Sequence, residues 1–335
     1  MQPIGEITFK FQYIYKGGVT IGPTKKGKAT EQELILGKDI LTYDHILDTT
    51  VRDNRLILAI STKAQVGKEL SKALIDGSAV GIEVYGVKAL ELEKFIDRIC
   101  SARETEKNRR RLVRKGKGKL FRTSSCPECS ATIDLSELDK TRYVYCRFCE
   151  TIFVEKQYIA TRGSVYRVCD ECSMFDRVRG YWEFYFYFFV LFMGSSSKRR
   201  YVCDNCAGVI FYKTFFLNLL FVLGVPASIY LKIKSLTGRD PYLRRLAKAN
   251  ALAKKGRYLE ASPIYDELRS EYPEHPGLLM DEGLGHMLGG DTEGAVACFE
   301  QSLKACSNYI PVVRLAKEIS EAFEKVSQAL EKDGS

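Results

Sequence analysis

The first hundred residues alternate short apolar runs with turn-forming residues, a pattern typical of β-strands. The alternating or apolar runs cover residues 7–15, 33–36, 55–60 and 81–85. The stretch VKALELEKFIDRI that follows places apolar side chains near one face of a helix, namely Leu92, Phe95, Ile96 and Ile99. We therefore expect residues 1–100 to form a small β domain closed by a C-terminal helix.

This order of strands followed by one helix is similar to the pleckstrin-homology-like barrel. The resemblance is carried by residues 40–61, ILTYDHILDTTVRDNRLILAIS, which look like a strand followed by a hairpin of that family. It contains no functional motif. In that family the barrel often docks on proteins or lipids, so the resemblance implies a docking domain and assigns no site residue.

Residues 209–234 form the most apolar stretch of the chain and include 18 consecutive residues without a charge. A helix of that length is about 27 Å long, close to the hydrocarbon thickness of a bilayer. We expect a membrane segment here, with Lys213 at one interface and Lys232 and Lys234 at the other. A buried helix between domains is the competing interpretation.

A second apolar run, residues 184–193, is rich in aromatic residues and too short to span a bilayer. It predicts either a buried hairpin strand or an interfacial insertion. Because Gly224-Val225-Pro226 would kink the longer segment, a single span and a re-entrant arrangement both stay open.

The region 242–331 is predicted to be helical and repeats itself after 34 residues. Gly256 to Ala261 is echoed by Gly290 to Ala295, and Tyr265 and Phe299 keep the same offset. This resembles the tetratricopeptide repeat, with the apolar helix from residue 312 to 330 as the capping element. The resemblance implies a groove that binds a peptide or helix of a protein partner.

Eight of the eleven cysteines stand in four CxxC pairs, and pairs of such pairs supply the four thiolates of a tetrahedral zinc site. The predicted zinc ligands, paired sequentially into two structural sites, are Cys126, Cys129, Cys146 and Cys149, then Cys169, Cys172, Cys203 and Cys206. The first set, in residues 123–156, resembles the zinc ribbon. The second, in residues 157–208, is predicted to be ribbon-like too, although 30 residues separate its two pairs.

Other uses of these cysteines fit the sequence less well. A disulfide framework is disfavoured because CxxC pairs are poor structural disulfides and no secretory signal is recognisable at the start of the chain. A thioredoxin-like centre needs one CxxC beside a βαβ unit, and a catalytic zinc site needs a nearby acid or base. No histidine occurs between residues 46 and 274.

The net charge of +9 is concentrated in one segment. Ten Lys and Arg against two Glu give +8 between residues 101 and 122, just before the first cysteine pair. The basic residues of this expected linker are Arg103, Lys107, Arg109, Arg110, Arg111, Arg114, Lys115, Lys117, Lys119 and Arg122. A solvated linker, a contact with anionic lipid and a contact with nucleic acid all remain open for it.

Together these patterns predict a multidomain α+β protein: a β domain, two zinc modules, a membrane segment and a helical repeat domain. The favoured hypothesis is a non-enzymatic, membrane-associated scaffold that binds a protein partner through its repeats, with the cysteine-rich part on the cytoplasmic side. A nucleic-acid-binding zinc-ribbon protein using residues 103–122 is the alternative. A homo-oligomer would complete the short repeat array.

Residues outside the cysteine pairs receive no chemical role. His275 and His286 are expected in a turn and on a helix surface, and Cys298 and Cys306 as small core side chains. An enzyme is disfavoured because the three histidines are scattered and neither a nucleophile elbow nor a phosphate-binding glycine loop is present.

Overall fold

The computed structural model describes residues 5–15, 19–20, 22–52, 54–154, 166–189, 192–219, 225–236 and 241–333. The chain separates into two compact units, residues 1–137 and 138–335. Each unit contains a large hydrophobic core of its own.

The first unit contains a curled antiparallel sheet in the order β5-β4-β3-β1-β9-β7-β6, with β2 beside β1 and β8 beside β9. Its strands are β1 (Ile7–Tyr15), β2 (Val19–Thr20), β3 (Lys25–Ala29), β4 (Glu33–Leu36), β5 (Asp39–Thr42), β6 (Ile46–Arg52), β7 (Arg55–Ile60), β8 (Leu74–Ile75) and β9 (Ala79–Tyr85). Two short helices, η1 (Tyr43–His45) and α1 (Lys68–Ala73), lie between them in sequence. Alternate residues point to opposite faces of a strand, and Phe9, Phe11 and Tyr13 of β1 are buried accordingly.

Helix α2 (Ala89–Arg114) is much longer than a closing helix needs to be. Leu92, Phe95, Ile96 and Ile99 are buried in the core of the sheet, as their spacing predicts. The helix then continues through the first half of the basic segment, and the short helix η2 (Gly118–Leu120) follows.

The hairpin of β10 (Thr123–Ser125) and β11 (Thr132–Asp134) packs on α2. The backbone N–H of Thr132 donates to Oγ of Ser101 at 3.0 Å. Several basic side chains of α2 and of the turn that follows it face carboxylates of the same unit: Arg109 and Arg110 pair with Glu106, Lys107 with Asp44, and Arg111 and Lys117 with Glu137.

The second unit combines antiparallel hairpins with helices. Its strands are β12 (Tyr143–Tyr145), β13 (Ile152–Val154), β14 (Tyr166–Val168), β15 (Phe175–Phe189) and β16 (Phe192–Cys203). Its helices are α3 (Asp204–Leu219), α4 (Val225–Leu236), α5 (Pro241–Ala253), α6 (Tyr258–Glu271), α7 (Pro276–Leu288), α8 (Thr292–Ala305) and α9 (Ile310–Asp333). Strands β15 and β16 form a long antiparallel hairpin. All residues of the aromatic run 184–193 except 190 and 191 belong to these two strands. Residues 190 and 191, and the side chains of the whole run, are outside what the structure describes.

The predicted C-terminal run of helices is present. Ala261 and Ala295, and likewise Tyr265 and Phe299, are buried at matching places on α6 and α8. Small residues allow the paired helices to approach, and the aromatic rings fill the space between them.

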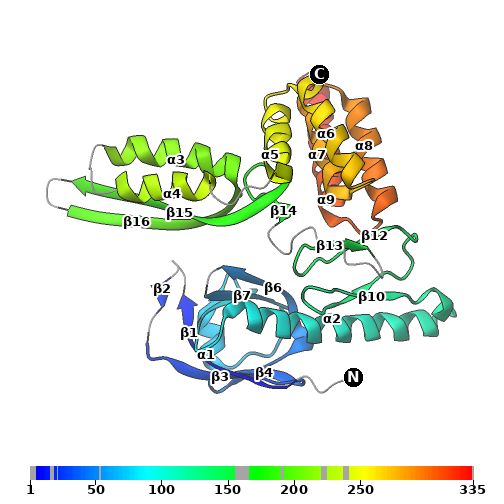
Figure 1. The fold of residues 1–335 in the computed structure, drawn as a ribbon. Coiled ribbons are helices and arrows are strands. Elements are labelled where there is room, and N and C mark those ends of the chain that lie inside the picture. The colour runs from blue at the N-terminus through cyan, green and yellow to red at the C-terminus, as the bar shows by residue number, and fades with distance from the viewer. Residues whose placement is uncertain are drawn as a thin grey trace. The chain divides into compact units, whose positions relative to one another are not determined.

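The predicted membrane segment is wrong. The described residues within 209–234 belong to two helices, α3 with 16 residues and α4 with 12, and among the described residues we find no helix both long and apolar enough to cross a bilayer. Pro226 stands at the second position of α4, where proline is well tolerated because its missing N–H has no intrahelical partner there. Helices α3 and α4 instead lie side by side along the β15–β16 hairpin (Figure 1).

Candidate metal centres

Both predicted four-cysteine groups are assembled with the sequential pairing. Cys126, Cys129, Cys146 and Cys149 form the first, and Cys169, Cys172, Cys203 and Cys206 the second. Within each group the sulfur atoms all lie within 4.8 Å of one another. Six of the eight cysteines are buried, and Cys149 and Cys172 are half-buried.

Three of the four CxxC pairs adopt the same tight turn. The N–H of the first cysteine donates to the carbonyl five residues later at 2.9 Å, in Cys126, Cys146 and Cys169 alike. The residue four positions after that cysteine is left-handed, with φ near +60° at Ser130, Glu150 and Ser173. Because the turn points two sulfur atoms to one side, it can supply two ligands from four residues.

The fourth pair differs from the prediction of a second ribbon. Cys203 is the last residue of β16, and Cys206 lies in the first turn of α3. The partial positive charge at a helix N-terminus stabilises a thiolate. The second group is therefore built from a turn, a long hairpin and the start of a helix.

The sulfur geometry of the second group fits zinc. Sulfur atoms around a tetrahedral zinc ion at about 2.3 Å would be about 3.8 Å apart. The Sγ atoms of Cys172 and Cys203 are 3.9 Å apart. The backbone N–H of Cys203 donates to Sγ of Cys169 at 3.3 Å, as a thiolate ligand would require.

Lys254 lies beside the second group. Its Nζ is 3.6 Å from Sγ of Cys203 and 3.4 Å from Sγ of Cys206. Burial disfavours the charge of this lysine, but the neighbouring thiolates, Cys203 foremost, outweigh that cost and raise its pKa above the usual value. Four thiolates around Zn²⁺ carry a net charge of −2, which the ammonium group partly balances.

A buried polar network joins the second group to the helices. Oδ1 of Asp281 on α7 accepts from the N–H of Phe175 at 2.6 Å, and the Asn250 amide on α5 donates to the Phe175 carbonyl at 3.1 Å. The hydroxyl of Tyr265 donates to Oδ1 of Asn250 at 2.7 Å. Burial raises the pKa of Asp281 well above its usual value and that of Asp176 to about 7.

Close packing accompanies this network. A Cβ atom on Gly277 would lie 2.6 Å from Cγ of Phe175, so only glycine admits the ring at this point of α7. The ring of His275, which precedes α7, packs against Phe175 and Tyr143 with centroid distances of 5.1 and 5.6 Å. Most of α7 is buried as a result.

The hairpin of β12 and β13 also rests on the helices. The backbone of Tyr145 makes two hydrogen bonds with the Asn308 side chain, at 2.9 and 2.7 Å, and the hydroxyl of Tyr143 donates to the Pro273 carbonyl at 2.8 Å. A face of the helical region that could bind a partner is thus covered by the chain itself.

Asp204 holds the start of α3. It accepts from Arg177 at 2.7 Å and from Arg179 at 2.9 Å, and Tyr181 donates to it as well. The side chain of Asp204 is only 2% exposed, so the two arginines and the helix N-terminus balance its charge.

A further group of metal-ligand side chains was not predicted. Glu282, His286 and Cys298 lie close together between α7 and α8. Glu282 and His286 are four residues apart, a spacing that places both on one face of a helix. Nothing in the sequence places Cys298 beside these two residues, or Lys254 beside the second cysteine group.

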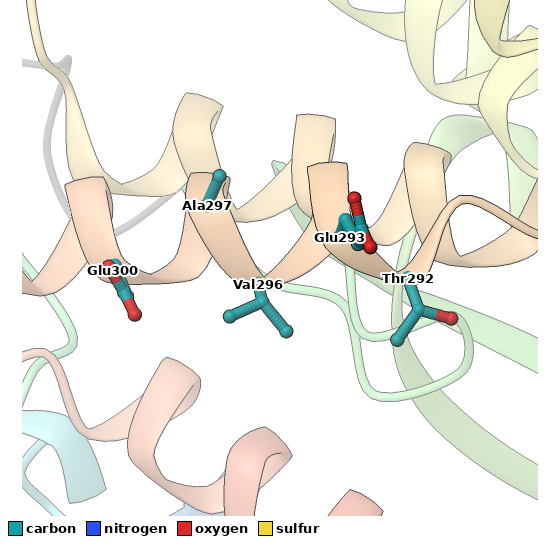
Figure 2. Close-up of a pocket in the computed structure, with 5 residues that line it drawn as sticks. All are labelled: Thr292, Glu293, Val296, Ala297 and Glu300. Atoms are coloured by element: carbon teal, nitrogen blue, oxygen red, sulfur yellow. The ribbon is translucent and has the colours of Figure 1, made fainter.

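The second unit also has two features on its surface. Exposed large apolar side chains gather on α3 and α4, namely Val209, Tyr212, Phe216, Ile229, Tyr230, Ile233 and Leu236. We call this set the α3–α4 apolar face. A shallow groove runs along α8 and is lined by Thr292, Glu293, Val296, Ala297 and Glu300 (Figure 2).

Comparison with known proteins assigns no family. No protein-family model matches the chain. Neither the curated proteins nor the solved structures contain a match.

Proposed function

We propose that this protein is a non-enzymatic, zinc-stabilised scaffold that attaches to the surface of a membrane through the α3–α4 apolar face. In this proposal the helical region is a tetratricopeptide-like domain. One of its faces is covered by the cysteine-containing hairpins of the same chain. Because thiolate ligands persist in a reducing compartment, the cysteine-rich part would face the cytoplasm.

The α3–α4 apolar face carries the proposal. Val209, Tyr212 and Phe216 follow the i, i+3, i+7 spacing of one helical stripe, and Phe216 is 65% exposed. Ile229, Ile233 and Leu236 form the corresponding stripe on α4. Exposed apolar side chains that gather on two packed helices are typical of a protein or membrane contact.

Charge favours a lipid surface as the occupant. The sequence from residue 205 to 239 contains four basic residues and no Asp or Glu. Among them, Lys213 is exposed between Tyr212 and Phe216, while Nζ of Lys232 lies 5.0 Å from the centre of the Tyr212 ring. Lysines beside an aromatic and aliphatic stripe suit the boundary between acyl chains and anionic headgroups.

Vesicle co-sedimentation of the full chain tests this function. We expect binding to vesicles that contain phosphatidylserine, and a loss of about 100-fold or more in the Phe216→Asp/Ile233→Asp variant, because each buried side chain contributes on the order of 2 kcal/mol. Leu259→Asp is the control, since Leu259 is 87% exposed on α6 and outside the face. Failure of the unaltered chain to bind, or equal loss in the control, contradicts the proposal.

The scaffold would present a protein-binding surface on α8. The covered face of α7 is occupied by the chain's own hairpins, whereas the groove along α8 places Val296, 49% exposed, between Glu293 and Glu300 (Figure 2). An apolar strip flanked by carboxylates suits a basic amphipathic helix of a partner.

The basic segment 103–122 adds less to this proposal than its charge suggests. The ion pairs of its basic side chains with Glu106, Asp44 and Glu137 offset part of its positive field. Nucleic-acid or anionic-lipid contact through this segment stays a prediction, for which steep weakening of binding with salt is the signature.

A further inference from the structure

Glu282, His286 and Cys298 meet between the two helices α7 and α8. One ligand atom from each lies within 4.8 Å of the other two. Glu282 and His286 are one helical turn apart, so both side chains leave the same side of α7. We propose that these three residues form a third metal site, which binds Zn²⁺ with three protein ligands and a water molecule.

The imidazole of His286 is fixed from three directions. Its Nδ1 lies 2.7 Å from Oδ2 of Asp291, and its ring is 3.7 Å, centre to centre, from that of Tyr258. A Cβ atom on Gly294 would lie 2.5 Å from Nδ1, so the absence of a side chain there makes room for the ring. A histidine so held before metal binding loses little freedom when it becomes a ligand.

The contact with Asp291 also selects the nitrogen that faces the metal. A carboxylate on Nδ1 leaves Nε2 as the ligand atom and increases its basicity, the arrangement common in zinc sites. Asp291 is itself held, because its Oδ1 accepts from the N–H of Gly294 at 2.9 Å and caps α8.

Glu282 is positioned in a similar way. The Tyr258 hydroxyl donates to Oε1 of Glu282 at 2.9 Å, and Nη1 of Arg269 lies 3.2 Å from Oε2. The Glu282 side chain is 5% exposed. A buried carboxylate beside a buried thiol is costly unless positive charge is near, and a zinc ion would supply more of it than Arg269 alone.

The donor set distinguishes this site from the two four-cysteine groups. One thiolate, one imidazole and one carboxylate suit zinc among the common divalent ions, and three protein ligands leave a coordination position for water. The His286 side chain is 15% exposed, so the site has a route to solvent. This site goes beyond the proposed scaffold role, which needs only the eight cysteines of the CxxC pairs.

Metal stoichiometry of the full chain tests the proposal. We expect three zinc ions per chain in micromolar free zinc, and two in either His286→Gln or Cys298→Ser. Cys306→Ser is the matched control: Cys306 is fully buried at the end of α8, where its Sγ donates to Oδ1 of Asn308 at 3.2 Å. Its variant should keep three ions.

Two zinc ions in the unaltered chain overturn the proposal, as do three ions that persist in both variants. Circular dichroism distinguishes loss of the site from loss of the fold, and Co²⁺ substitution adds a readout that folding does not mimic. The third Co²⁺ ion should have a weaker sulfur charge-transfer band than the first two, since it has one thiolate ligand in place of four. Asp291→Asn, which keeps the helix cap, should weaken only the third ion, by about 10- to 100-fold.

Discussion

His275 is a buried, neutral histidine. Its replacement by phenylalanine should remove part of the dependence of the protein's stability on acid pH. The residue is 1% exposed, and neither ring nitrogen has a hydrogen-bond partner. Its ring packs between Tyr143 and Phe175, so phenylalanine fits the surroundings in shape and chemistry. Burial lowers the pKa of His275 from 6.5 to about 4.

The sign of the effect follows from proton binding. Between pH 6.5 and 4 the unfolded state binds a proton at this position and the folded state does not, so the stability contributed by His275 is lost as the pH falls through that window. The loss between pH 7 and pH 5 is about 2 kcal/mol, and it reaches about 3 kcal/mol below pH 4. Buried Asp281 and Asp176 have raised pKa values and act in the opposite direction, which is why only the difference between variants isolates His275.

Urea unfolding at pH 7 and pH 5 measures that difference. Trp182, the single tryptophan of the chain, lies in β15 and reports on the second unit by its fluorescence. We expect the free energy of unfolding of His275→Phe to rise by about 2 kcal/mol relative to that of the unaltered chain when the pH is lowered from 7 to 5. Tyr309→Phe, at another fully buried ring of the same core, is the control and should show no such gain. A pH-independent difference for His275→Phe would refute the reasoning.

Two further substitutions test the attachment of the second cysteine group to the helices. Lys254→Met should weaken zinc binding at that group alone by about 10- to 100-fold in chelator competition, because the partial charge balance is lost. Lys248→Met, at an exposed position of α5, the helix that ends one residue before Lys254, should leave it unchanged. Gly277→Ala should lower the free energy of unfolding by about 1–3 kcal/mol because its Cβ would displace the Phe175 ring. Gly208→Ala, whose new Cβ would lie no closer than 4.0 Å to another group, Nζ of Lys232, should be neutral or stabilising, and equal destabilisation by both alanines would contradict the packing argument.

Local patterns predicted the parts of this fold that short-range chemistry determines. The strands near residues 7–15, 33–36, 55–60 and 81–85 and the buried face of α2 follow from two simple periodicities. The turns of three of the four CxxC pairs follow from their local spacing, because each is closed by hydrogen bonds within six residues, whereas Cys203 and Cys206 are placed by the end of β16 and the start of α3.

What the sequence left undecided depends on contacts between distant residues. An apolar run of 18 residues fits a membrane span and a pair of packed helices equally well, and only the tertiary structure separates them. Lys254 is 48 residues from Cys206, and Asp281 is 106 residues from Phe175. No spacing rule connects such pairs.

We infer that the second cysteine group and the helices of the second unit form one zinc-dependent structural unit. Amide hydrogen exchange of the full chain, with zinc and after its removal by a chelator, measures this dependence. Because structural zinc contributes on the order of 10 kcal/mol of folding free energy, we predict that protection is lost both in residues 166–181 and on α7. Unchanged protection of both segments after zinc removal would contradict the claim.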